Sequence, residues 1–251
     1  MLVLLAGCAS GTTADADAEA WSEAIKSQDL ATIDELLETH SEPDRTGDGG
    51  KTALMIAAQA GDLGLVERLL EAGADVDARN EHLGTPLMFA ATGGSVPVCR
   101  MLIDRGAAVD AAARLGWTSL LLAAAKGNTG AALLLIGSGA DPNRADGYGW
   151  TPLMRAVTGR HLDTVRSLLD TGNMDLAARE ESGASVLHIA AGEGQADMVA
   201  ALLAAGADPA LPDGAGRTAA AVAMMMGHRD LAARLAAAED AADPSARLRM
   251  P

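Results

Sequence analysis

The feature that most constrains the fold is a segment that recurs at an almost constant interval along most of the chain. Six copies align on their first residue: TALMIAAQAG from Thr52, TPLMFAATGG from Thr85, TSLLLAAAKG from Thr118, TPLMRAVTGR from Thr151, SVLHIAAGEG from Ser185 and TAAAVAMMMG from Thr218. The steps between them are 33, 33, 33, 34 and 33 residues. A fixed period in this range is typical of a solenoid, in which each repeat packs only against its neighbours.

Each copy predicts a helix, a reversal and a second helix. Threonine or serine at the start is a preferred N-cap, and Pro86 and Pro152 follow at the first helical position, where no N–H is missed. Gly61 and its equivalents stand where the first helix must stop, a place that favours positive φ. In the fourth copy Arg160 stands there instead, and a left-handed conformation costs such a residue about 1–2 kcal/mol. Gly159, one residue earlier, is therefore the expected residue for that turn.

The segments resemble the ankyrin repeat, whose copies begin with TPLHxAA and end with a GADVN turn. Here the ends read LLEAGADVDA from Leu69, LLLIGSGADPN from Leu133 and LLAAGADPA from Leu202. The resemblance covers residues 19–238 and implies an all-α ankyrin repeat solenoid of stacked helix-turn-helix units with short β-hairpin-like loops. A weaker first copy around Trp21 and the last copy from Thr218, which lacks the GAD turn, are expected to cap the array, for about seven units in all.

The N-terminus suggests a lipid anchor. Leu5-Ala6-Gly7-Cys8 looks like a bacterial lipobox, in which the cysteine is acylated. A basic n-region is missing, so the native start is expected upstream of Met1. The alternative is a ragged apolar end on a cytosolic protein. The expected organisation is a lipoprotein signal remnant (1–8), a flexible tether (9–18), the ankyrin repeat domain (19–238) and a C-terminal tail (239–251).

Composition and motifs exclude several functions. The net charge is −15, from 34 acidic and 19 basic residues, and such a surface repels nucleic acid. Eleven acidic residues fall between positions 15 and 48, either as a solvated cap or as a site for a basic partner. The chain lacks HExxH, GxxxxGK[ST], GxSxG and paired-cysteine patterns, so no catalytic residue, metal or cofactor is expected. Cys99 is expected to be a buried small hydrophobe.

The resemblance also implies where a partner would bind and what His188 does. In ankyrin repeats a histidine at the position of His188 bonds the backbone of the neighbouring loop, and the loop residues before each threonine line a concave face together with the end of the first helix. Three of the five aromatic residues, Trp117, Tyr148 and Trp150, fall in these loops. With Leu115 they are expected to form one exposed patch, bordered by Lys126, Arg155, Glu193, Met225 and Met226. The alternative is that each tryptophan packs along its own hairpin.

The sequence therefore predicts a non-enzymatic scaffold that binds another protein and not nucleic acid. It is expected to be monomeric and tethered through Cys8 to a membrane, facing the bacterial periplasm. Three alternatives remain open: an immunity or protective protein that inhibits a specific enzyme or toxin, a cytosolic adaptor, and an enzyme or the regulatory subunit of one.

Overall fold

The computed structural model of the chain describes residues 12–39 and 42–242, and this part of the chain is all-α. It contains fourteen α-helices, two short 3-10 helices, η1 (Asp48–Gly50) and η2 (Arg114–Gly116), and no strand. Among the described residues, β-type pairing occurs at two isolated antiparallel bridges, Thr46 with Thr52 and Arg179 with Ser185. The predicted fold class is confirmed. The chain divides into two compact units after Ala108, and each is described by itself.

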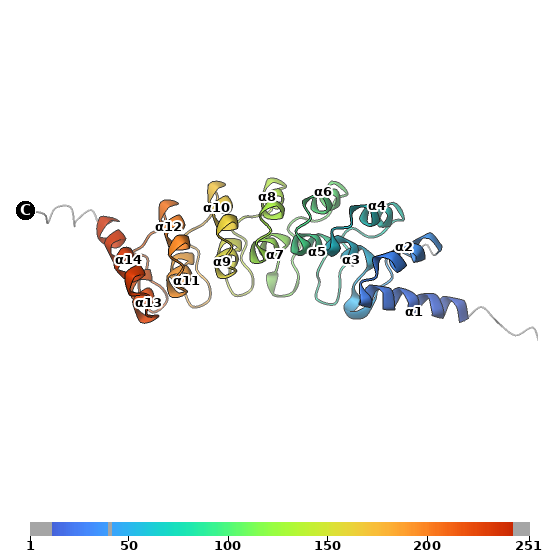
Figure 1. Cartoon of the computed structure of the whole chain (residues 1–251), viewed down its shortest axis with the longest axis horizontal. Helices are drawn as coiled ribbons and strands as arrows, with labels where there is room; N and C mark the ends of the chain where they lie inside the picture. Colours follow the sequence, from blue (N-terminus) through green and yellow to red (C-terminus); the bar gives the residue numbers. More distant parts are fainter. Residues whose placement is uncertain (1–11, 40–41, 243–251) are drawn as a thin grey trace, which may run out of the picture. The chain divides into compact units, whose positions relative to one another are not determined.

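The first unit consists of three helix pairs. Its helices are α1 (Thr12–Ser27), α2 (Leu30–Thr39), α3 (Ala53–Ala60), α4 (Leu63–Glu71), α5 (Pro86–Gly93) and α6 (Val96–Asp104). Helix α3 packs on α5, and α4 packs on both α2 and α6 (Figure 1). Trp21, Ile25 and Ile33 of the first pair are almost fully buried, as expected of a repeat that covers the end of a stack.

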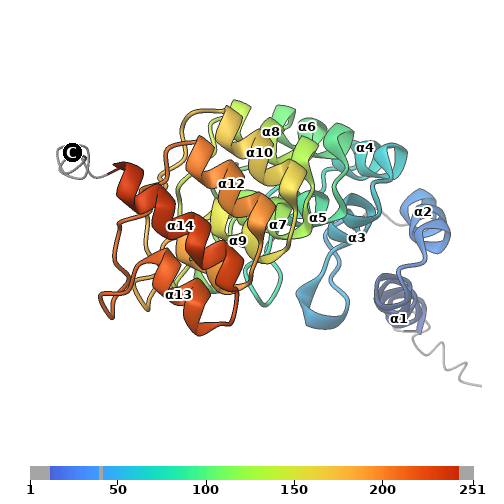
Figure 2. The ribbon, with the colours of Figure 1, turned by 60° about the vertical axis from the view of Figure 1, so that its left-hand side comes forward.

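The second unit contains four pairs. Its helices are α7 (Ser119–Lys126), α8 (Thr129–Gly137), α9 (Pro152–Thr158), α10 (Leu162–Asp170), α11 (Val186–Gly192), α12 (Ala196–Ala204), α13 (Ala219–Met225) and α14 (Arg229–Ala242). Contacts run from α7 to α9, α11 and α13 in one layer, and from α8 to α10 and α12 in the other. Figure 2 shows both layers from the side of α14. Alanines at the contacts, such as Ala123, Ala156 and Ala190, are fully buried, so the helices approach closely.

Local chemistry sets the helix ends. The hydroxyls of Thr52, Thr118, Thr151 and Thr218 each accept a hydrogen bond from the backbone N–H three residues on, as N-caps. Glycine ends several first helices in the left-handed region, as at Gly127 with φ 73°.

The fourth copy departs from the expectation for its turn. Arg160 itself adopts φ 61°, whereas Gly159 is right-handed at φ −71°, so the prediction that Gly159 takes the left-handed conformation is wrong. The helix still ends in register, because His161 N–H bonds the Ala156 carbonyl at 3.0 Å and thereby places residue 160 at the reversal. Gly159 is instead required for steric reasons, because a Cβ at this position would lie 2.5 Å from the His161 ring.

Side chains also tie successive pairs of the second unit together. His161 Nε2 lies 3.1 Å from the Ala125 carbonyl, and Gln195 Nε2 donates to the Val157 carbonyl at 3.1 Å. His228 sits at the equivalent place in the last pair and reaches the Gly192 carbonyl at 3.2 Å. Each bond joins the turn of one pair to the end of the preceding first helix, so neighbouring loops keep a fixed spacing.

The boundaries at both ends differ from those expected. Helix α1 begins at Thr12, so residues 12–18 are helical where the sequence analysis expects a tether. Residues 14–20 alternate alanine with aspartate and glutamate, and alanine is the strongest helix former while acidic residues suit a helix N-terminus. At the other end α14 continues to Ala242, past the expected boundary at 238. Cys8 lies outside the described residues.

Candidate functional site

The loops that precede the first helices of the second unit are tight hairpins. In each, the backbone N–H of the first residue donates to the carbonyl of the residue just before the threonine or serine: Ala113 to Trp117 at 2.8 Å, Asp146 to Trp150 at 3.0 Å, Glu180 to Ala184 at 3.1 Å and Asp213 to Arg217 at 2.8 Å. Residues 115, 148, 182 and 215 are then at the tips, and residues 117, 150, 184 and 217 at the bases. The candidate partner site lies on the first two of these hairpins.

Leu115 and Tyr148 occupy the tips and are the exposed part of the candidate site. Leu115 is 58% exposed and Tyr148 46% exposed. The two tips are joined, because Gly147 N–H donates to the Leu115 carbonyl at 2.7 Å, and Glu181 N–H continues the row to the Tyr148 carbonyl at 3.0 Å. Leu115 is also held at φ 57°, a conformation that a leucine adopts at a cost of about 1–2 kcal/mol. The joined tips thus present two exposed apolar side chains, one of them on a strained backbone.

At the hairpin bases, Trp117 and Trp150 hold an arginine. The Arg155 guanidinium, from α9, lies 4.5 Å from the centroid of the Trp117 ring and 4.9 Å from that of Trp150. Both tryptophans are half-buried. The rings therefore lie on one edge, one repeat apart, but their faces are partly covered by the arginine, and the exposed patch is smaller than expected. The side chains at the tips supply it, and the tryptophans with Arg155 form its base.

Asp146 completes this cluster, and the sequence analysis missed it. Its side chain is fully buried, its Oδ2 pairs with Arg155 Nη2, and its Oδ1 accepts from the backbone N–H groups of Tyr148 at 2.9 Å and Trp150 at 3.1 Å. The carboxylate thus fixes both the hairpin and the guanidinium. We call Trp117, Trp150, Arg155 and Asp146 the tryptophan–arginine cluster.

A periodic signal for Asp146 was present in the sequence. Asn80, Glu180 and Asp213 occupy the same place in other loops, and each side chain accepts from the backbone N–H groups two and four residues on. A polar acceptor at this interval indicates a hairpin held by a side chain. Nothing in the pattern indicates that Asp146 also pairs with Arg155. This ion pair depends on how the following helix, α9, places Arg155.

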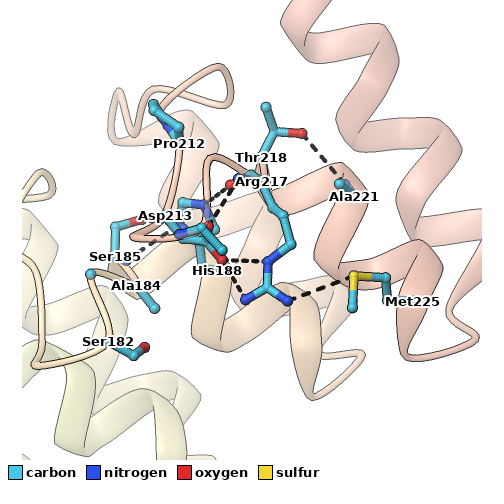
Figure 3. A network of polar contacts seen from close by, with 12 residues as sticks. Ser182, Ala184, Ser185, His188, Pro212, Asp213, Arg217, Thr218, Ala221 and Met225 are labelled. Carbon is cyan, nitrogen blue, oxygen red and sulfur yellow. Dashed lines mark hydrogen bonds and ion pairs between the residues drawn. The ribbon is translucent and has the colours of Figure 1, made fainter.

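The other predicted partner residues lie at the ends of first helices. Lys126 is exposed at the end of α7. Met225 and Met226, 65% and 63% exposed, lie at the end of α13. The described contacts place Met225 beside Arg217, the base residue of the last hairpin, with Arg217 Nη1 3.8 Å from the Met225 Sδ (Figure 3). The methionines thus belong to the last hairpin, two repeats beyond Trp150.

His188 has the structural role that the resemblance implies. Its Nδ1 accepts from the Ser185 backbone N–H at 3.2 Å, and its Nε2 lies 2.9 Å from the Arg217 carbonyl in the next hairpin (Figure 3). A backbone N–H can only donate, so Nδ1 is the acceptor and Nε2 carries the proton that bonds Arg217. The ring therefore joins two successive loops, and the prediction is confirmed.

Among residues 12–39 and 42–242, no group of three or more histidine, cysteine or carboxylate side chains is placed to hold a metal ion. Cys99 is fully buried, and burial raises the pKa of its thiol to about 11. No helix within the described ranges has the length and apolar character needed to span a bilayer.

Comparison with known protein families identifies the repeats. A family model described as ankyrin repeats (3 copies) matches residues 4–80, 21–113, 62–146 and 109–180, and one described as ankyrin repeats (many copies) matches residues 168–223. A search of curated protein sequences gives no match. Ankyrin repeats are in general protein–protein interaction modules. With its period, its capped helix pairs and its hairpins, the chain belongs to the ankyrin repeat family.

Proposed function

We propose that this protein is a non-enzymatic scaffold that binds a partner protein through the Leu115 and Tyr148 tips and the tryptophan–arginine cluster. The observation that carries the proposal is the placement of two exposed apolar side chains on a base that is already rigid. Leu115 and Tyr148 lie at the tips of hairpins joined by a 2.7 Å backbone bond, and the bases of the same hairpins carry two tryptophans on which an arginine stacks. An exposed apolar patch on a protein surface usually marks an interaction site, and tyrosine is among the residues most enriched at binding hot spots.

Preorganisation supports this surface as the binding site. Side chains that must be ordered on association cost about 0.5–1.5 kcal/mol each. In the tryptophan–arginine cluster that ordering is complete before a partner arrives, since Asp146 bonds Arg155 and two hairpin N–H groups. A partner has only to bury the tips and the free edges of the rings. Trp, Tyr and Arg are also the residues most enriched at hot spots.

We also propose that the scaffold is tethered by a lipid on Cys8 and faces the bacterial periplasm. The support is the sequence Leu-Ala-Gly-Cys at positions 5–8, with the polar segment that follows it. Expression of the native gene with labelled palmitate tests this proposal. Label in the membrane fraction is expected for the wild-type protein and not for Cys8→Ser, and equal membrane recovery of the variant would refute the tether.

The binding surface is tested with a photo-crosslinking amino acid placed at position 148 of the full chain, and in a second sample at position 133. Leu133 of α8 is 39% exposed and provides the control position. A partner captured from 148 and not from 133 is then purified, and its affinity is measured for wild type, the Leu115→Ala/Tyr148→Ala double variant and Leu133→Ala.

We expect the double variant to bind at least about thirtyfold more weakly, since hot-spot truncation commonly costs 2 kcal/mol or more. Leu133→Ala should bind within about twofold of wild type, as expected for a surface residue outside the interface. Helical circular dichroism should be the same for all three proteins. If the double variant and Leu133→Ala weakened binding equally, or if the double variant bound as tightly as wild type, the interface would lie elsewhere.

A further inference from the structure

Three consecutive methionines at the end of α13 have larger exposed fractions than the other methionines of the described chain. Met224, Met225 and Met226 are 53%, 65% and 63% exposed. In contrast, four methionines of other helices are nearly or fully buried: Met55, Met88, Met154 and Met198. We call residues 224–226 the methionine triplet.

The position of Met224 in its repeat explains part of this exposure. Its equivalents in the three preceding repeats of the second unit, Ala124, Val157 and Ala191, are fully buried because the next helix pair covers them. Helix α13 belongs to the last described pair, and no later element of the described chain covers its far side. Met224 is therefore at the end of the described stack, Met225 is the last residue of the same helix, and Met226 is its C-cap.

An arginine is fixed beside the central sulfur. Arg217 Nη1 lies 3.8 Å from the Met225 Sδ, and the same guanidinium is held by Asp213 through Nε at 2.8 Å and Nη2 at 2.7 Å (Figure 3). A third bond holds the arginine backbone, since Asp213 Oδ1 accepts from Arg217 N–H at 2.9 Å. The Arg217 guanidinium is thus a hydrogen-bond donor of fixed orientation, and its acceptor is the Met225 thioether sulfur, which is a weak acceptor.

We propose that the methionine triplet is a reversible oxidation site for hydroperoxides, and that Arg217 binds the oxygen added to Met225. In the reaction, the Sδ lone pair attacks the terminal peroxide oxygen, an S–O bond forms and the O–O bond breaks. The leaving alkoxide or hydroxide takes the hydroperoxide proton and departs as alcohol or water. Sulfur is oxidised by two electrons and the hydroperoxide is reduced by two.

The geometry favours this product at Met225. A sulfoxide oxygen is a far stronger acceptor than a thioether sulfur, and a cationic donor makes the stronger class of hydrogen bond. Because Asp213 fixes the guanidinium on one side of the sulfur, the two sulfoxide epimers of Met225 are not equivalent, and one of them directs its oxygen toward Arg217. Sulfoxides are reduced by two reductases, each specific for one epimer. A pair of thiols supplies the two electrons and becomes a disulfide, and the oxygen leaves as water, so the surface can be switched from apolar to polar and back.

The first test is peptide mapping of the full chain after limited treatment with hydrogen peroxide. Trypsin releases the triplet as residues 218–229, while Met154 and Met55 lie in the separate peptides 145–155 and 52–68. We expect the triplet peptide to gain oxygen at least about tenfold faster than the two control peptides, because susceptibility follows exposure. In urea the three peptides should react at similar rates per methionine, so the triplet peptide should then gain oxygen only about three times as fast as either control peptide. Equal rates in the folded protein would overturn the proposal.

The second test concerns Arg217. After partial oxidation of wild type and of the Arg217→Gln and Arg217→Lys variants, each of the two reductases is applied and the sulfoxide left at Met225 is quantified. Wild type should carry a clear excess of one epimer at Met225, and the glutamine variant a ratio near one. The lysine variant, which keeps a cationic donor, should retain part of the excess. A ratio near one in wild type would refute the role of Arg217.

Discussion

Replacing Arg155 by leucine tests whether the tryptophan–arginine cluster is a rigid unit. Arg155 stacks on two half-buried rings and pairs with the fully buried Asp146 carboxylate, while its own side chain is 21% exposed. Two cation–π contacts at a half-buried site are together worth about 2 kcal/mol. Breaking a fully buried ion pair costs about 3–5 kcal/mol, and the partial exposure of the arginine reduces this to roughly 2 kcal/mol.

Leucine restores about 1 kcal/mol of apolar contact with the rings, so the expected loss of unfolding free energy is about 2–4 kcal/mol. A double-mutant cycle separates the charge from the packing. In Asp146→Asn the amide oxygen still accepts from the two hairpin N–H groups but carries no charge. The Asp146→Asn/Arg155→Leu protein should therefore recover part of the loss, with a coupling energy of at least about 1 kcal/mol.

The assay is urea unfolding followed by both tryptophan fluorescence and circular dichroism. Trp117 and Trp150 are two of the three tryptophans in the chain, so removal of the guanidinium should also change native emission. Arg166, an exposed residue of α10, provides the control, and Arg166→Leu should stay within about 0.5 kcal/mol of wild type. If Arg155→Leu lost as little unfolding free energy as Arg166→Leu, or if the coupling energy of the double-mutant cycle were zero, the cluster would not be a coupled unit.

Three further perturbations have expected outcomes. Leu120→Ala in α7 should cost about 2–5 kcal/mol in urea unfolding by leaving a cavity, and Lys126→Ala on the same helix less than about 0.5 kcal/mol; equal costs would contradict the stacked core. His188→Ala should cost about 1–3 kcal/mol by leaving two backbone groups without their partner, and a neutral result would contradict the loop-to-loop role. Hydrogen bonds from the Arg217 side chain and from the backbone N–H groups of Arg217 and Ala215 lower the pKa of Asp213 from 3.8 to about 2, so the stability gained from these bonds should be complete above pH about 4 and lost as the pH falls toward 2. Asp213→Asn should remove that part of the acid unfolding profile, and an unchanged profile would refute the assignment.

The family resemblance implied the hairpins and the contact of His188 with the next loop, while the sequence by itself determined the repeat and the helix pairs. These features depend on local chemistry that recurs with the period: a hydroxyl that caps the next turn, a proline that suits the first helical position, a glycine that reverses the chain. The exposed positions of Leu115 and Tyr148 also follow from register, because residues two places before a hairpin base fall at its tip.

Only the tertiary structure decided how the side chains of successive repeats combine. Arg155 was one of several bordering residues in the sequence, and its place against Trp117 depends on the spacing between α7 and α9 and on a buried carboxylate from another loop. Arg160 adopts the left-handed conformation because helix register outweighs a local cost of about 1–2 kcal/mol. Local preferences amount to a few kcal/mol per site, whereas stacking sums over every repeat interface, so stacking prevails wherever the two conflict.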